Sequence, residues 1–215
     1  MRFEAFEEII SQLKALNLPG EGAQMQMAPP FRNELIQQHQ TEGRVPKRAA
    51  VMALLYPDKN NQTSLVFIVR NSYDGVHSGQ IGFPGGKPEP EDQDMADTAY
   101  RETWEEIGVE PRSIRLIRPM TELYIPPSNY NVSPFLGVTN KTPKFKLQLS
   151  EVQSIIEVTL EDILDDKHQI LTVVKTSYGP HVEAPAFQFN GQIIWGATAM
   201  ILMEIVRLFQ SILKK

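Results

Sequence analysis

The stretch from Gly85 to Val109 constrains this chain more than any other part of it. It reads GGKPEPEDQDMADTAYRETWEEIGV. An aspartate near residues 92–94 can cap the first turn of a helix, and Gly108 can end that helix in a left-handed conformation. The stretch therefore predicts one helix between a glycine turn and a glycine stop.

Three glutamates, Glu102, Glu105 and Glu106, share one side of this helix. At about 100° per residue they fall within roughly 100° of one another, and Trp104 is expected to pack in the core from the opposite, mostly apolar side. Like charges at these spacings repel by a few tenths of a kcal/mol per pair, and the negative end of the helix dipole lies close by. A divalent cation would compensate. The alternative is a solvated acidic face.

Composition excludes several classes of function. The 215 residues are 41% hydrophobic and 22% charged, as in an ordinary globular protein, and the net charge of −5 gives no basic field for nucleic acid. The absence of cysteine excludes disulfides and thiolate catalysis, and fits a cytoplasmic protein. The apolar stretch at residues 193–206 is interrupted by Glu204, so we expect a buried helix and no membrane span.

Apolar patterning predicts helices at both ends of the chain and strands between them. Helical spacing covers residues 1–17 and 194–213, and two apolar runs at 49–56 and 64–70 predict a hairpin. This order indicates an α/β sandwich, with residues 1–44 as a helix and lead-in segment and 45–215 as the main domain. Further short strands are predicted at 114–123, 132–139, 155–160, 170–176 and 186–189.

The glycine-flanked helix resembles the Nudix box, G-x5-E-x7-R-E-U-x-E-E-x-G-U, where U is a bulky apolar residue. Two departures stand out. The interval from Gly86 to Arg101 is one residue longer, which moves the upstream acid to Asp92, or alternatively to Glu91, and Thr103 replaces the usual apolar residue. The residues that match by type are Gly86, Arg101, Glu102, Glu105, Glu106, Gly108 and Val109.

The longer interval looks like the coenzyme A pyrophosphatase branch of Nudix hydrolases. That branch carries an upstream signature, approximately L-L-T-x-R-[SA]-x3-R-x3-G-x3-F-P-G-G, and residues 67–70 and 83–86 match it together with Gly79. His77 and Gln80 stand where that branch often has them. The second arginine of the signature is Gly75 in this chain. The resemblance covers roughly residues 45–205.

The resemblance implies an α/β/α sandwich with a central mixed sheet, a loop-helix-loop motif and hydrolysis of a diphosphate bond. It implies Mg²⁺ or Mn²⁺ held by Glu102 and Glu106 with Glu105 contributing; all three are catalytic candidates. Glu105 is the first choice for the general base, a role that spacing leaves open. Arg101 and Asp92 would support the site. The residues expected to bind substrate are Arg70, His77, Gln80, Gly85 and Gly86.

The leading functional hypothesis is cleavage of coenzyme A or acyl-coenzyme A to 3',5'-ADP and a 4'-phosphopantetheine. The partner would be a small nucleoside diphosphate derivative, without nucleic acid or membrane, and a homodimer is left open. Gly75 favours a second hypothesis, a pyrophosphatase of ADP-sugars or dinucleotides. A third is a Nudix module that binds ligand without catalysis. Tyr124, Tyr130 and Phe135 either line a substrate pocket or order their own loop.

Overall fold

The chain folds around a hairpin of two long, mostly buried strands. The computed structural model describes residues 1–71, 80–176 and 179–213. Strand β1 (Lys47–Pro57) turns through residues 58–62 into β2 (Thr63–Arg70), which pairs with it antiparallel. The Asp58 carboxylate accepts hydrogen bonds from the amides of Asn60 and Gln62, both at 2.8 Å, and so fixes the turn. The predicted hairpin is confirmed.

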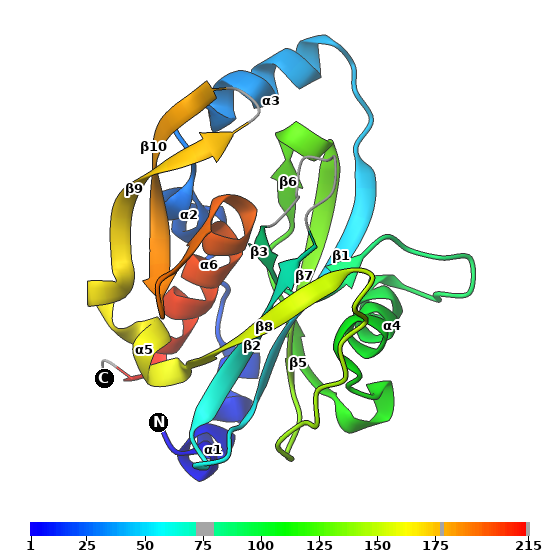
Figure 1. The fold of residues 1–215 in the computed structure, drawn as a ribbon, viewed down its shortest axis with the longest axis vertical. Coiled ribbons are helices and arrows are strands. Elements are labelled where there is room, and N and C mark those ends of the chain that lie inside the picture. Colours follow the sequence, from blue (N-terminus) through cyan, green and yellow to red (C-terminus); the bar gives the residue numbers. More distant parts are fainter. Residues whose placement is uncertain (72–79, 177–178, 214–215) are drawn as a thin grey trace.

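A mixed sheet extends from both strands of this hairpin (Figure 1). Its other strands are β3 (Ile81–Gly82), β4 (Gly85–Gly86), β5 (Arg115–Pro119), β6 (Leu123–Ile125), β7 (Tyr130–Val138) and β8 (Val152–Thr159). β7 runs parallel to β1, whereas β8 pairs antiparallel with β2. The short strands β3 and β4 pair with β2 and β1, and they bring the glycine-rich segment onto the sheet. The single strand predicted over residues 114–123 is divided between β5 and β6.

A second, antiparallel sheet comprises β9 (Gln169–Thr176), β10 (Gly179–Phe189) and β11 (Gln192–Trp195). The helix predicted from residue 194 begins only at Gly196, because Ile194 and Trp195 pair with β10 as part of β11. Gly196 then adopts a left-handed φ of 62°, which redirects the chain from strand to helix.

Helices cover both faces of the large sheet. They are α1 (Phe3–Ala15), α2 (Glu21–Gln24), α3 (Arg32–Thr41), α4 (Met95–Ile107), α5 (Leu160–Leu164) and α6 (Gly196–Leu213), with 3-10 turns at Met25–Met27, Pro111–Ser113, Pro126–Ser128 and Asp166–His168. One core lies between the sheet and α4, and the other between the sheet and α1 with α6. The predicted α/β/α sandwich with a central mixed sheet is confirmed (Figure 1).

Helix α6 is apolar around most of its circumference because it packs on both sheets. Its residues share one core with Phe67 of the large sheet and with Phe187 and Phe189 of the small one. By length and composition alone this helix could cross a membrane, but most of its residues are buried inside the fold. Phe6 of α1 belongs to the same core, so the N-terminal helix is an integral part of the packing. The boundary proposed at residue 44 stays a prediction.

A fully buried carboxylate, Glu204, ties the N-terminal segment to α6. It accepts hydrogen bonds from the Gly20 amide at 3.1 Å, the Gln24 side-chain amide at 3.1 Å and the Thr121 hydroxyl at 2.5 Å. A buried charge is tolerated where several donors surround it. Glu204 therefore fixes the path of the chain just before α3.

Glu204→Ala is expected to lower the free energy of unfolding by about 2–4 kcal/mol, because it leaves several buried donors without an acceptor. Urea unfolding measures this change. Glu8→Ala on the exposed side of α1 is the matched control and should change it by less than about 0.5 kcal/mol. Equal effects of the two substitutions would show that the buried carboxylate does not hold the segment.

Candidate active site

Helix α4 begins and ends where the sequence predicts. The Asp94 carboxylate accepts hydrogen bonds from the amides of Ala96 at 2.8 Å and Asp97 at 3.0 Å, as a helix cap does. At the other end Gly108 has a left-handed φ of 74°, and its amide bonds to the Trp104 carbonyl. Local capping chemistry thus determines the register of the three glutamates along the helix.

The faces of α4 differ from those predicted. Glu106 is 1% exposed and packs against the sheet, in the same buried arc as Met95, Ala99 and Ile107. Trp104, expected in the core, is 53% exposed. Two of the carboxylates, Glu102 and Glu106, therefore lie on the side of α4 that faces the sheet. They fit there because the glycine segment offers a backbone amide to Glu106 and has no side chain beneath Glu102.

Glu106 lies at the junction of α4, β4 and β2. Its Oε2 accepts a hydrogen bond from the Gly85 amide at 2.8 Å, and Arg70 Nη1 lies 3.3 Å from Oε1. Oε1 is buried and has no hydrogen-bond partner among the residues described. Burial raises the pKa of Glu106 to about 7, against the lowering effects of Arg70 and the Gly85 amide. The cation that faces this oxygen in the structure is the Arg70 guanidinium.

The Glu102 carboxylate packs against the backbone of Gly86, where there is no side chain. A Cβ on Gly86 would be 2.3 Å from Glu102 Oε1, and a Cβ on Gly85 would be 2.2 Å from the Ala50 carbonyl oxygen. Gly85 therefore requires glycine, because a side chain there would clash with backbone, whereas a side chain at Gly86 would displace the Glu102 carboxylate. Burial also raises the pKa of Glu102, opposed by Arg101.

Arg101 holds the outer carboxylates in place. Its guanidinium donates to Asp92 at 3.0 and 3.1 Å, to Glu102 at 3.1 Å, to Glu105 at 3.0 Å and to the Lys87 carbonyl at 2.8 Å. The Arg101 hydrogen bonds lower the pKa of Asp92 to about 2. Asp92, rather than the exposed Glu91, is the acid that meets Arg101. That Arg101 and Asp92 support the site remains a prediction.

The donor set fits a hard divalent cation. Mg²⁺ and Mn²⁺ prefer oxygen ligands, and the site offers carboxylate oxygens of Glu102 and Glu106, including the Glu106 Oε1 that accepts no hydrogen bond from the residues described, next to close backbone at the glycine pair. Across the described residues no three acidic or histidine side chains already converge as a metal cluster. Glu105 is turned toward Arg101 instead, with its side chain 41% exposed.

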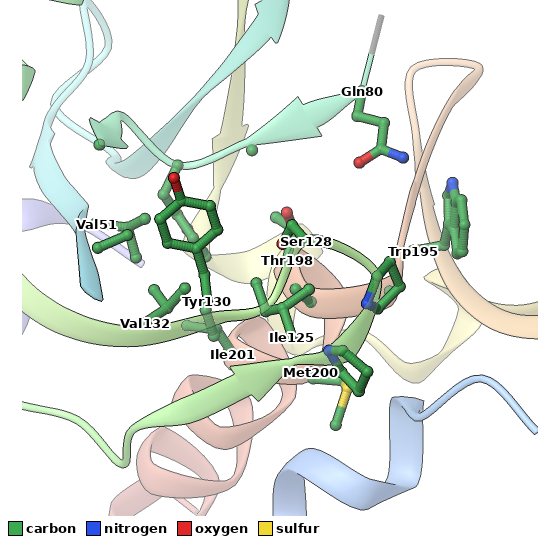
Figure 2. Close-up of a pocket in the computed structure, with 18 of the residues that line it drawn as sticks. Val51, Gln80, Ile125, Ser128, Tyr130, Val132, Trp195, Thr198, Met200 and Ile201 are labelled. Carbon is green, nitrogen blue, oxygen red and sulfur yellow. The ribbon is translucent and has the colours of Figure 1, made fainter. Parts of the chain in front are cut away.

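A pocket of about 340 Å³ opens beside these carboxylates. Arg70, Gln80, Gly85, Gly86 and Lys87 line one part of it. Figure 2 shows its mostly apolar body, with Gln80 and Trp195 on one side and Val51 on the other. The other labelled lining residues are Ile125, Ser128, Tyr130, Val132, Thr198, Met200 and Ile201.

Of the three aromatic residues considered from the sequence, only Tyr130 lines this pocket. The Tyr124 hydroxyl bonds with His39 at 2.7 Å and Asn129 at 2.8 Å, and so orders its loop. Phe135 is buried in the core under α4. His77, with Gly75 and Gly79 of the signature, lies outside the described residues, so its predicted role is untested.

Two contributors to the site could not be recognised in the sequence. The segment around Pro29, Phe31, Arg32 and Leu35 forms part of the pocket wall, although it lies far upstream of the Nudix box. Glu151 is close enough for its charge to raise the pKa of both Glu102 and Glu106. Neither has a local motif, so only the tertiary fold brings them to the site.

Comparison with known families decides the identity of the domain. A family model described as NUDIX domain matches residues 46–175. The chain belongs to the Nudix family. The crystal structure of a MutT/nudix family protein from Enterococcus faecalis shows the same fold at a TM-score of 0.52 and 17% identity, covering 91% of this chain and 73% of that chain.

Two Nudix relatives have names that agree with the branch expected from the sequence. Peroxisomal coenzyme A diphosphatase ndx-8 of Caenorhabditis elegans is 29% identical over 159 residues, 73% of this chain and 66% of that protein. Mitochondrial coenzyme A diphosphatase NUDT8 of Mus musculus is 33% identical over 172 residues, 75% of this chain and 79% of that protein. This chain thus spans just under two thirds of the worm protein's length.

The cytoplasmic location expected from the sequence is contradicted by these Nudix relatives. Their names place the worm protein in peroxisomes and the mouse protein in mitochondria. The absence of cysteine, on which the expectation rested, excludes neither compartment.

The stability of the metal-free protein should fall as the pH rises from about 5 to about 8. The folded pKa of Glu106 is about 7 against an ordinary 4.5, so the folded state binds a proton that the unfolded chain has lost between those values. This stabilising contribution is complete below the ordinary pKa and is lost as the pH rises through about 7. Glu102 acts in the same direction.

Thermal unfolding of wild type and Glu106→Gln across this pH range, in EDTA and in Mn²⁺, measures the effect. In EDTA the difference in Tm between the two proteins should depend on pH. Mn²⁺ should raise the Tm of wild type more at the alkaline end of the range than at the acidic end. Parallel pH profiles for both proteins would contradict the assignment of the raised pKa to Glu106.

Proposed function

We propose that this chain is a divalent-metal-dependent pyrophosphohydrolase that cleaves coenzyme A or its thioesters. The observation that carries the proposal is the buried Glu106 carboxylate, which is bound to the Gly85 amide, lies 3.3 Å from Arg70 and is close enough to Glu102 for that charge to raise its pKa. A binding module without chemistry has no use for clustered, partly buried carboxylates: besides burial, the charge of Glu102 raises the pKa of Glu106, and the charge of Glu105 raises the pKa of Glu102. The names of the worm and mouse relatives support the choice of substrate.

The reaction is the hydrolysis of one P–O–P linkage. A water oxygen attacks one phosphorus atom, the bond from that atom to the bridging oxygen breaks, and the bridging oxygen leaves with the other phosphate. With coenzyme A the products are 3',5'-ADP and 4'-phosphopantetheine. Mg²⁺ or Mn²⁺ held by Glu102 and Glu106 would neutralise the diphosphate and help to polarise the water.

Each side chain of the site has a role in this scheme. Glu105 is half-exposed and hydrogen-bonded only to Arg101 among the described residues, so it can accept the proton of the attacking water. Arg70 lies between Glu106 and the pocket, where its guanidinium can bind a phosphate oxygen. Arg101 keeps Glu102 and Glu105 oriented through its bonds to Asp92.

The pocket next to the carboxylates suits a substrate with a substantial organic group. Its volume lies at the lower end of the range of about 300–1,000 Å³ that is typical of small-molecule sites. The apolar body at Val51, Ile125, Val132 and Met200 has room for part of a nucleoside or pantetheine group, with the diphosphate at the Arg70 end. Gly75, where the branch signature has arginine, favours ADP-sugars or dinucleotides as the second candidate class.

Glu106→Gln is expected to lower kcat/KM for coenzyme A by at least about 100-fold, because one ligand of the cation loses its charge. Activity is measured with Mg²⁺ and with EDTA on coenzyme A, ADP-ribose, NADH and a diadenosine polyphosphate. Glu110→Gln, an exposed carboxylate just beyond the helix, is the control and should retain wild-type activity.

Efficient cleavage of another diphosphate without turnover of coenzyme A would overturn the choice of substrate but not the reaction. Absence of any hydrolysis, with ligands still bound, would favour the binding module.

A further inference from the structure

Arg32 places a buried positive charge in the wall of the pocket. It is the first residue of α3, it is 8% exposed, and it lines the pocket with Phe31 and Leu35. A guanidinium buried to this extent is normally paired with a carboxylate or another anion.

The described partners of Arg32 do not neutralise it. Its Nη1 donates to the Tyr124 carbonyl at 2.6 Å, and its Nε is buried without a hydrogen-bond partner. Within residues 1–71, 80–176 and 179–213 no carboxylate lies within 4.0 Å of its guanidinium, and Glu21 acts on it only at longer range. Burial lowers the pKa of Arg32, as expected for a charge that lacks an adjacent counterion.

The other arginine of the pocket wall differs from Arg32. Arg70 is paired with Glu106 and with the Gly85 carbonyl, next to the candidate metal site. Arg32 comes from the N-terminal segment, which Glu204 holds against α6 through Gly20 and Gln24. Arg70 and Lys87 therefore line the part of the pocket next to the glycine pair, and Arg32, with no adjacent carboxylate among the residues described, adds a cation from a different element.

We propose that Arg32 binds a second anionic group of the substrate, separate from the diphosphate, and that it selects substrates that carry one. This inference rests on the proposed function. In coenzyme A such a group is the 3'-phosphate, and in the thioester of a dicarboxylic acid it is the terminal carboxylate. Arginine binds either group through paired N–H donors, and the buried Nε–H would gain the acceptor it lacks.

The test compares kcat/KM for two substrate pairs in wild type, Arg32→Gln and Arg118→Gln. The pairs are coenzyme A against 3'-dephospho-coenzyme A, and malonyl- against acetyl-coenzyme A. Arg118 is the matched control, because its Nε is also buried without a partner, but its guanidinium donates to the carbonyls of Leu13 and Leu16 away from the pocket. Arg32→Lys, which keeps the charge, is measured in parallel and replaces Arg32→Gln if that variant does not fold.

Wild type is expected to prefer the more anionic member of at least one pair by about 10- to 100-fold, and Arg32→Gln to abolish that preference. Arg32→Lys should retain part of it. Loss of the preference for coenzyme A over 3'-dephospho-coenzyme A identifies the 3'-phosphate as the ligand of Arg32. Loss of the preference for malonyl- over acetyl-coenzyme A identifies the carboxylate. Arg118→Gln should leave both ratios unchanged even if it lowers stability.

Unchanged ratios in both Arg32 variants, with all four substrates still cleaved, would overturn the inference and leave the proposed function standing. The failure of wild type to cleave any of the four would overturn the proposed function, and the role of Arg32 would fall with it.

Discussion

The hydrogen bond between the Gly85 amide and the buried Glu106 carboxylate joins the two parts on which the site depends. Gly85 belongs to β4, which pairs with the central strand β1, and Glu106 lies in the last turn of α4. The contact fixes how the helix lies on the sheet, and it keeps a carboxylate oxygen in a place where water has little access. The raised pKa of Glu106 follows from the same burial.

Two arginines make this concentration of negative charge tolerable. Arg101 binds Asp92, Glu102 and Glu105, while Arg70 lies 3.3 Å from Glu106. The repulsion evident from the sequence is thus reduced by cations supplied from α4 itself and from the end of β2. Arg101 makes five hydrogen bonds within the protein, whereas Arg70 contacts Glu106 and the Gly85 carbonyl and also lines the pocket.

The ends of α4 could be predicted from the sequence because they depend on local contacts. Features of the site that depend on long-range packing could not. Asp94 and Gly108 delimit α4 through contacts within a few residues, so the helix could be placed from the sequence alone. The exposure of Trp104 could not be predicted, because the side of α4 that is buried depends on how the helix packs on strand β4. The contribution of Arg32 to the pocket depends on the N-terminal segment, which Glu204 anchors across the fold, and no local pattern reports such a contact.

The central claim is that Glu106 and Glu102 hold a divalent cation beside the glycine pair. Anomalous diffraction from crystals soaked in Mn²⁺ tests it most directly, since it locates the ion without reference to activity. We expect a peak within about 2.5 Å of Glu106 Oε1 and of a Glu102 oxygen, with the Arg70 guanidinium displaced toward the pocket. A peak elsewhere, or an unchanged Arg70–Glu106 pair with no ion beside it, would contradict it.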